Sequence, residues 1–541
     1  MSWRKRTWIL LVVLTVLGVF ATLGGIVVYK WQMPRIRQKL IALLSDKLGS
    51  SVELGEISIA LGPVVHVTVH SVVLHHKPFV DGPPLVAIDT CTIEVPVLAI
   101  LRRPVHVSSV ELTGLHVFVP PRPKDGDKKD DDASSPAPAG DESRPTLSRS
   151  LGGKTPVVVD RLTANDTLLE IGTRKEGRPP RQFIIHKLTL SKAAFDRPTS
   201  YQAELTNPLP KGLIEATGTF GPWMAADPSL TPLTGAFTFN NAELDTIKGI
   251  GGTLSSEGTF AGRLEQIRVH GKTQTPDFSI DIGGNPVSLN TEYSAIVDGT
   301  NGDTLLDPVE ATLGQSHMTA RGGVVHTEGK HGRTVELDVT VDNGRIEDML
   351  RLAIKGDPDM SGGFTMTTHL ELPPGESPVP VRLMLKGKFH IASARFASNQ
   401  VQDKIDELSR RGRGEPENQK VDNVASELRS DFALGHGTLA MKGLQFKVRG
   451  ADIRLDGTYS MTAHTLDFLG EARMEARVSQ MVTGWKKVPL KAVDPILAKD
   501  GAGAVVPIRI AGPVAKPEFK VEMGRIFHGG DKKKPDPPKK N

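Results

Sequence analysis

Two short stretches of the sequence contain the Gly-Lys-Thr triplet that phosphate-binding loops use. One is GGKT at Gly152–Thr155 and the other is GKT at Gly271–Thr273. A P-loop needs a further glycine five positions before the glycine that precedes the lysine, because the loop must wrap closely around the phosphates. Ser148 and Gln266 occupy those positions here. The sequence therefore predicts no nucleotide site at either stretch.

The histidines and acidic residues do not form a metal-binding pattern. His66 and His70 lie on one face of an apparent strand, and His75 and His76 follow them closely. Histidines without a carboxylate at metal-ligand spacing are more often surface or pocket residues than ligands. The stretch DGTNGD at 298–303 is similar to a calcium loop, but it lacks the EF-hand spacing and the distal glutamate. A turn is the better prediction there, and we expect no metal ion.

The only cysteine, Cys91, excludes an intramolecular disulfide and a cysteine-rich zinc site. It lies in an apparent strand, which favours a buried and unreactive thiol over a nucleophile. The motifs H-E-x-x-H and G-x-S-x-G do not occur. We therefore expect that the protein is not an enzyme and needs no cofactor, with an envelope enzyme as the alternative that the residues favour least.

The composition excludes a nucleic-acid-binding surface as the main feature. The chain of 541 residues has 66 Lys and Arg against 62 Asp and Glu, which is a formal net charge of +4. Such a balanced charge gives no basic footprint for a phosphate backbone. The 54 glycines and 39 prolines indicate many tight turns.

One apolar stretch near the N-terminus predicts a transmembrane helix. Residues 8–29 carry no charge, and about 22 residues at helical rise span the hydrocarbon core of a bilayer. Trp8, Tyr29 and Trp31 are placed at the membrane interface, where amphipathic aromatic side chains are favoured. A cleaved signal peptide is the alternative, but signal peptides have an apolar region of only about 7–15 residues. We expect a cytoplasmic tail at 1–7 and the bulk of the chain on the far side of the membrane.

Residues 30–49 predict an amphipathic helix, which either rests on the membrane surface or plugs the start of the next domain. After it the pattern changes to short β-branched runs that alternate in polarity, as in an all-β protein. Helical spacing returns only at 344–355, at 399–411 with Asn399 as its cap, and in two shorter stretches at 479–487 and 495–499. Long helices that alternate with strands are absent, which excludes a doubly wound sheet. The predicted regions are an N-terminal β region at 50–121, a disordered insertion at 122–155, a central β region at 156–380, a C-terminal β region at 381–527 and a basic flexible tail at 528–541.

The last third of the chain has the clearest alternation. Apolar residues alternate with charged ones, which indicates a sheet with one wet face and one dry face. The dry face is either plain core or a surface for an apolar ligand. Its candidate lipid-binding residues are Leu444, Phe446, Val448, Ile453, Leu455, Leu466, Phe468 and Met474.

About two dozen strands at 4.8 Å each would make a continuous sheet on the order of 100 Å long, and its dry face must be covered. A sandwich, a closed barrel and a curled trough all achieve this. The membrane tether and the few helices favour an elongated antiparallel sheet curled into a groove.

The chain resembles the AsmA family of bacterial envelope proteins. The resemblance covers the N-terminal layout, with LGSSVELGEISIALGPVVHVTVHSVVL after the membrane helix, and the C-terminal stretch GTLAMKGLQFKVRGADIRLDGTYSMTAHTLDFLGEARM. Its most specific part is PIRIAGPVAKPEF at 507–519. The resemblance implies a single-pass inner-membrane protein with a periplasmic β-groove, similar to chorein-like bridge proteins that move lipid between membranes.

Two functions follow as expectations. In the first, the protein takes part in outer-membrane biogenesis and binds or conducts phospholipid along the groove, with lipid admitted where the sheet begins at the inner membrane. In the second, it is a periplasmic scaffold that influences the assembly and targeting of outer-membrane proteins without carrying lipid. The expected partners are phospholipid, the inner membrane and envelope or outer-membrane assembly proteins, and no nucleic acid.

Overall fold

The structure is a computed structural model of the chain. It describes residues 37–38, 41–42, 45, 51–75, 84–100, 104–119, 157–171, 181–194, 196–222, 224, 227–281, 284–299, 301–326, 332–417, 423–482, 494–498, 503–514 and 516–521. The predicted membrane helix at 8–29, with Trp8, Tyr29 and Trp31, lies outside these residues, as do the predicted insertion at 122–155 and the predicted tail at 528–541. Within the described part, no helix has the length and apolar character needed to cross a membrane.

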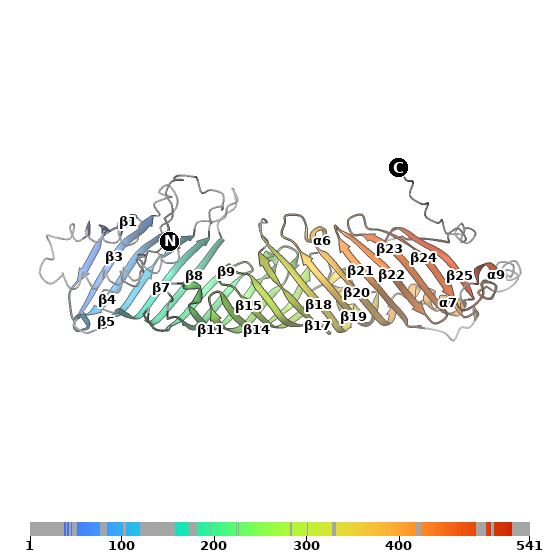
Figure 1. Cartoon of the computed structure of the whole chain (residues 1–541), viewed down its shortest axis with the longest axis horizontal. Coiled ribbons are helices and arrows are strands. Elements are labelled where there is room, and N and C mark those ends of the chain that lie inside the picture. The colour runs from blue at the N-terminus through green and yellow to red at the C-terminus, as the bar shows by residue number, and fades with distance from the viewer. Residues whose placement is uncertain are drawn as a thin grey trace, which may run out of the picture. The chain divides into compact units, whose positions relative to one another are not determined.

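The described chain is mostly β, as the alternation predicts. Its strands form a sheet of 26 strands with only a few short helices (Figure 1). By its internal contacts the chain divides into two compact units. Unit 1 comprises 1–246, 254–272 and 296–302, and unit 2 comprises 247–253, 273–295 and 303–541.

Unit 1 begins at the blue end of the colour scale in Figure 1. Its elements are β1 (Ser51–Leu54), β2 (Ile57–Ala60), β3 (Val64–His75), β4 (Val86–Pro96), α3 (Val97–Ile100), β5 (Val105–Thr113), β6 (His116–Val119), β7 (Val157–Ile171), β8 (Arg181–Ala193), β9 (Thr199–Pro208), β10 (Lys211–Phe220), η2 (Pro228–Leu230), β11 (Pro232–Glu243) and η3 (Leu244–Thr246).

Most neighbouring strands of unit 1 pair antiparallel, with one departure from the predicted antiparallel sheet. Strands β1 and β2 both pair with β3, at its two ends. Strands β5 and β6 both pair with β7 in parallel. A parallel pair needs a crossover of about a dozen residues or more. The 37 residues between Val119 and Val157 supply that length, so β7 can run in the same direction as β5 and β6.

The core of unit 1 lies at its N-terminal end. Buried side chains from one face of β1 to β8 form a single cluster. Val67, Val69, Ile93 and Val107 are fully buried in it. Burying a valine or isoleucine side chain contributes about 1.5–3 kcal/mol, so this cluster is a major source of stability.

Four strands follow η3. They are β12 (Ile250–Gly251), β13 (Thr253–Arg263), β14 (Gln266–Ile280) and β15 (Val287–Val297). Strand β13 belongs to unit 1 except for its first residue, β12 belongs to unit 2, and β14 and β15 have residues in both units. Pro276 is exposed within β14, where proline donates no ladder hydrogen bond.

Unit 2 contains the remaining elements. They are β16 (Thr304–Leu313), β17 (Ser316–His326), β18 (Arg333–Arg345), α5 (Ile346–Ala353), β19 (Met360–Leu372), α6 (Val379–Arg382), β20 (Met384–Phe396), α7 (Asn399–Gly412), β21 (Ser426–Gly435), β22 (Thr438–Val448), β23 (Ala451–Ser460), β24 (Thr465–Met474), η4 (Val478–Gln480), α9 (Asp494–Leu497), β25 (Ala504–Pro513) and β26 (Glu518–Val521). From β16 to β26 each strand pairs antiparallel with the next.

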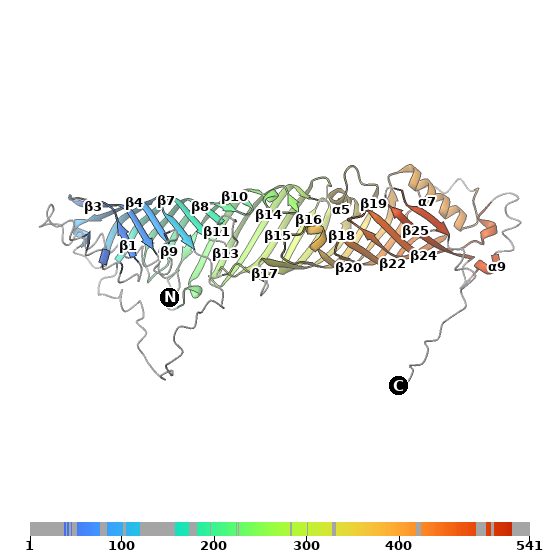
Figure 2. The same ribbon diagram turned by 90° about the horizontal axis from the view of Figure 1, so that it is seen from above.

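Two helices of unit 2 follow strands and fold back onto the sheet (Figure 2). Helix α5 follows β18 and packs Ile346 against Phe364 and Ile391. Helix α7 follows β20 and packs Ile405 against Val448 and Ala451. The expectation that Asn399 caps α7 is wrong, because the cap position is Ser398 and its side chain makes no capping hydrogen bond. The helix is held instead by its packed apolar side.

Candidate functional site

The apolar face of unit 2 is the candidate site. Directly opposed residues of neighbouring strands carry their side chains on the same face of a sheet. The register therefore extends one line of same-face positions from Val309 on β16, through Val339 and Gly387, to β26. Its C-terminal part, called here the open row, consists of Phe432, Met441, Gly457, Phe468, Ile510 and Phe519.

The structure brings all the predicted lipid-binding residues onto this one face. Leu444 is opposite Leu455, and Phe446 is opposite Ile453. The remaining four lie on the same face in register with β23, at Val448, Leu466, Phe468 and Met474. Their grouping follows from the alternation, which the ladder preserves across three strands.

Helix α7 covers part of that group. Phe446, Val448 and Met474 belong to the cluster around Ile405 and Leu408 of the helix. Their contacts are those of a protein core, which is one of the two readings that the alternation allows. The open row lies farther along the strands, and the clusters around α5 and α7 do not include it.

Phe432, Met441 and Gly457 are partly exposed, Phe468 is the buried member of the open row, and exposure rises from Phe468 to the edge strand. Phe468 is 8% exposed, whereas Phe519 on β26 is 73% exposed. Gly457 allows β24 and the Phe468 ring to approach β23 closely, because a Cβ atom at Gly457 would stand 2.6 Å from ring atom Cδ1 and 2.3 Å from the Asp467 carbonyl oxygen. This part of the face ends in side chains that water reaches, which is costly for large apolar groups.

Sequence reasoning missed Phe432, Met441, Ile510 and Phe519. Each occupies an alternating apolar position in its strand, so the period-two signal was present in all four segments. Only the register shows that they continue the line through Phe468. Register is a long-range property that a single strand does not encode.

The opposite face of these strands is charged. Arg509 binds Asp467 through two nitrogen–oxygen contacts of 3.0 Å each. The hydrogen bond from Arg509 lowers the pKa of Asp467, with attraction to the guanidinium charge adding to it and desolvation opposing it. Gln445 bridges Arg429 at 2.6 Å and Asp452 at 2.7 Å. Ion pairs and hydrogen bonds between neighbouring strands therefore hold the polar side chains on this face, opposite the apolar one.

Two adjoining hollows open on this charged side of β18 to β22. Their volumes are about 730 Å³ and 670 Å³, and they share Thr367, Lys388, Asp431 and Lys442 as lining residues. Thr367, Lys388, Asp431 and Lys442 are exposed members of the polar side of their strands. Phe432 of the open row also lines the first of these hollows, so this hollow borders the open row.

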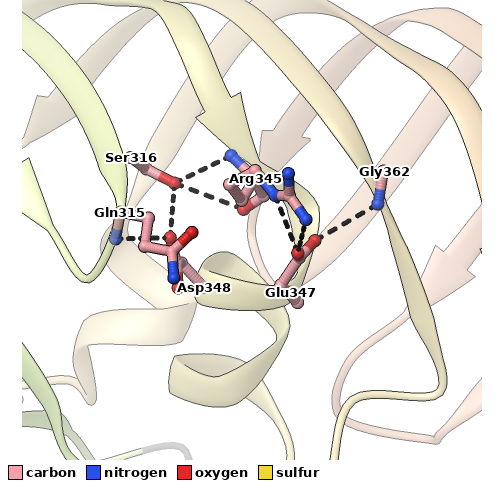
Figure 3. Close-up of polar contacts among 6 residues, drawn as sticks. All are labelled: Gln315, Ser316, Arg345, Glu347, Asp348 and Gly362. Atoms are coloured by element: carbon pink, nitrogen blue, oxygen red, sulfur yellow. Dashed lines mark hydrogen bonds and ion pairs between the residues drawn. The ribbon is translucent and has the colours of Figure 1, made fainter.

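The most enclosed polar cluster of unit 2 surrounds Asp348 (Figure 3). Asp348 is 2% exposed and accepts hydrogen bonds from the Gln315 backbone N–H at 2.9 Å and the Ser316 hydroxyl at 2.8 Å. The Arg345 N–H donates to the Ser316 oxygen at 2.9 Å. This cluster ties α5 to the turn between β16 and β17, and no imidazole belongs to it. Its arrangement is that of a structural anchor.

Glu347 extends the same cluster. It accepts from Arg345 Nε at 2.8 Å and from the Gly362 backbone N–H at 3.2 Å (Figure 3). Burial raises the pKa of Glu347, but these hydrogen bonds and the Arg345 charge outweigh burial, so its pKa is lowered. A carboxylate held in its ionised form by backbone donors is suited to fixing a loop and not to proton transfer.

Two further buried carboxylates have the same role. Asp406 on α7 accepts from the backbone N–H groups of Asn423 at 2.8 Å and Val424 at 2.9 Å. Asp494 on α9 accepts from the Ser479 N–H at 3.0 Å and its hydroxyl at 2.6 Å. Burial raises the pKa of Asp494, but the Ser479 hydrogen bonds prevail and lower it. Both residues join a helix to a neighbouring segment.

The stretches first examined for chemistry have structural roles where they are described. Gly271–Thr273 lies inside β14 and not between a strand and a helix, and Gly152–Thr155 lies outside the described residues. His66 contacts Glu94 at 3.3 Å, His70 contacts Thr90 at 3.4 Å and His75 contacts Glu53 at 3.7 Å. In the described ranges no group of three or more His, Cys, Asp or Glu is placed to hold a metal.

Cys91 is buried, as predicted from its strand. Burial raises the pKa of its thiol to about 12. At the predicted turn, of which residues 298–299 and 301–303 are described, the Gly302 N–H donates to the Asp298 carbonyl oxygen at 2.5 Å.

No family model matches the chain, and neither the curated proteins nor the solved structures contain a significant match to it.

Proposed function

We propose that the protein is anchored in a bacterial inner membrane, with its sheet in the periplasm, and that it serves outer-membrane biogenesis by binding or conducting phospholipid. The observation that supports this most is the open row of unit 2. Its apolar side chains form one line across adjacent strands, and the buried clusters around α5 and α7 do not include them. An acyl chain laid along this row would cover the same surface.

The mechanism is shielding and involves no covalent step. Each methylene group kept out of water contributes about 0.8 kcal/mol, so an acyl chain of about a dozen methylenes gains on the order of 10 kcal/mol from an apolar track. Polar headgroups would remain at the rim, where water reaches them. The charged opposite side, fixed by pairs such as Arg509 with Asp467, keeps the sheet soluble while its apolar face carries the ligand.

Matched substitutions on the two faces of one hairpin test the proposal. Phe432 and Met441 are opposite each other on the apolar face, and Ala433 and Ala440 are opposite each other on the polar face. We expect Phe432→Asp or Met441→Asp to reduce the phospholipid that co-purifies with the full chain, because a carboxylate in the track must lose its hydration. Ala433→Asp and Ala440→Asp leave it unchanged. Phosphorus analysis of the extracted lipid measures this.

The folded state of each variant is checked by its thermal unfolding. If lipid content falls equally in all four folded variants, or falls only with the alanine substitutions, the open row is not the track. The latter result would direct attention to the 730 Å³ hollow, which Ala433 and Ala440 line together with Phe432.

A protein-binding scaffold is the second candidate, and β26 favours it. Among the described strands β26 pairs with β25 alone, and all four of its residues are exposed. An open edge strand is a template on which a partner can add a strand. The partner would be an envelope or outer-membrane assembly protein.

A photo-reactive residue placed at Lys520, which lies on the polar side of β26, distinguishes the two candidates. A defined cross-link to an outer-membrane assembly protein, formed by a chain that purifies without lipid, would favour the scaffold. Cross-linking to no protein by a chain that retains lipid would favour the track.

A further inference from the structure

Unit 1 also contains an apolar face that continues from strand to strand. Directly opposed positions share a face, so the printed register can be followed from the first strands to β11. One such line runs through Ile59, Val67, Ile93, Val110, Leu162, Leu190, Tyr201, Gly218 and Gly235.

The exposure of this line changes between β8 and β9. From Ile59 to Leu190 the side chains are 0–6% exposed. Tyr201, Gly218 and Gly235 are each partly exposed. The same face is therefore a closed core over β1 to β8 and an accessible surface from β9 onward.

Helical residues close the core at its first strand. Ile41 packs against the buried cluster, and α3 adds Val97. Arg37 Nε donates to the Leu54 carbonyl oxygen at 2.8 Å, and the Val52 N–H donates to the Ser45 hydroxyl at 3.2 Å. These bonds satisfy backbone groups on the outer edge of β1, which a sheet edge otherwise leaves unpaired. Ile41, Arg37 and Ser45 are described residues of the stretch 30–49, which the sequence predicts to be an amphipathic helix.

Two aromatic rings mark the boundary of the closed part. Tyr201 and Phe220 pack against its last side chains, with their ring centroids 6.3 Å apart. The Tyr201 hydroxyl lies 2.6 Å from the point where a Cβ atom of residue 235 would stand, so only glycine fits at Gly235. Past the boundary Phe237 and Phe260 form a second ring pair, also 6.3 Å apart, and both are partly exposed.

Protein cores are packed as densely as crystals of small organic molecules, so a core of this kind has no free path for an acyl chain. Val67, Val69, Cys91, Ile93 and Val95 are fully buried in the middle of the closed part. A lipid that came in at the first strand would have to separate these side chains from one another. The accessible surface beyond Phe220 requires no such rearrangement.

We infer that β1 to β8 form a lipid-excluding plug, and that acyl chains reach the apolar face of unit 1 from the side, beyond the Tyr201–Phe220 ring pair. The inference rests on the proposed lipid-binding function and assigns a site of access within it. It replaces the expectation that lipid is admitted where the sheet begins. The site comprises the partly exposed face of β10, β11 and β13, with Phe237 and Phe260 as its aromatic residues.

Photo-labelling of the unaltered full chain tests the inference. The protein is reconstituted into vesicles of phosphatidylethanolamine and phosphatidylglycerol that contain a phospholipid with a diazirine in its acyl chain. After irradiation, peptide mass spectrometry locates the labelled residues. We expect label on β11 and β13, near Phe237 and Phe260, and none on β3 to β5, near Val67 and Ile93.

Label on β3 to β5 would overturn the plug while leaving the lipid-binding function intact. Label on none of the strands of either unit would overturn both, because it would show that the sheet takes up no acyl chain. The two failures are thus distinguished by where the label lies.

Three variants distinguish access from the side from passage through β1 to β8. Phe237 and Ala236 are neighbours on opposite faces of β11. Phe237→Asp should cause a loss of label on β13, and Ala236→Asp should leave it unchanged. Val67→Ala loosens the plug, so it should raise the label on β13 only if lipid passes through the closed part. Unchanged labelling in a folded Val67→Ala chain supports access from the side.

Discussion

Buried carboxylates of this protein bind backbone amides. Asp406 is 4% exposed, and besides the two N–H groups of Asn423 and Val424 it accepts from Gln402 Nε2 at 2.9 Å. Such a residue joins α7 to the chain that enters β21. From sequence alone it is one acidic residue among several on an amphipathic helix, because its partners lie 17 and 18 positions away.

Replacing Asp406 should therefore destabilise the protein. Asp406→Asn turns N–H donors towards backbone N–H groups and leaves buried donors unsatisfied, which costs about 1–3 kcal/mol. Chemical denaturation measures the change. Asp403→Asn, on the exposed side of the same helix, is the matched control and should change the free energy of unfolding by less than about 0.5 kcal/mol. Equal effects of the two substitutions would show that Asp406 is not an anchor.

His369 gives the protein a predictable pH dependence. Its Nδ1 lies 2.8 Å from an oxygen of Asp338, and its Nε2 lies 3.6 Å from an oxygen of Glu336. The hydrogen bond to Asp338 raises the pKa of His369 above 6.5, helped by the charges of Asp338, Glu336 and Glu371 and opposed by burial. The folded state therefore favours the protonated ring. This contribution is complete below the unfolded pKa and is lost as the pH rises through the folded pKa.

A proton NMR titration of the His369 imidazole measures this pKa directly. Asp338→Asn should return the pKa of His369 towards its ordinary value. The stability difference between the native chain and Asp338→Asn should shrink as the pH rises above the folded pKa. A difference that grows over that range would contradict the assigned direction.

At the scale of elements, the alternation predicts the strands well. It does not predict the points within a strand at which the buried positions shift by one residue. Ser71 in β3 and Ser393 in β20 have φ angles of 53° and 54°. In β3 the buried positions run Val65, Val67 and Val69 before Ser71 and Val72 and Leu74 after it. One residue with left-handed backbone angles shifts the buried positions by one. A serine in the sequence does not predict such a conformation.

The turn between β21 and β22 also contains residues with left-handed backbone angles, and substitutions there can test their effect on stability. His436 and Gly437 have φ angles of 51° and 72°, and they join strands paired at Gly435 and Thr438. Two positive φ angles are the signature of a type I′ hairpin, which favours Asn-Gly. We expect His436→Asn to preserve or raise stability and His436→Val to lower it by about 1–2 kcal/mol. Thermal unfolding measures both.

Ala433→Val, at an exposed strand position of the same hairpin, is the control for added branching and should be close to neutral. If valine were tolerated equally at both positions, the left-handed turn would be wrong.

The sequence predicts two of the helices but not which face of the sheet they cover. Their apolar spacing predicts α5 and α7, and both are present. Their position on the apolar face does not follow from spacing, although it decides that Phe446 belongs to a core while Phe519 stays exposed. The eight residues predicted from the sequence share one face of the sheet, and in the structure three of them, Phe446, Val448 and Met474, lie in the cluster with α7.

At the scale of the whole molecule, an all-β sheet is predictable because period-two alternation is strong throughout the chain. The parallel pairing of β5 with β7 is not, because the 37 residues between Val119 and Val157 permit either direction. The plug is likewise hidden, because Val67 in the closed part and Phe237 in the accessible part have the same alternating pattern. Only packing separates them.

The central claim is that the apolar face carries phospholipid, and native mass spectrometry of the purified full chain tests it most directly. The account predicts mass additions that match phospholipid, retained by the native chain and by Ala433→Asp and diminished in Phe432→Asp. A folded native chain that purifies with no bound lipid, and that takes up none from phospholipid vesicles, would contradict it.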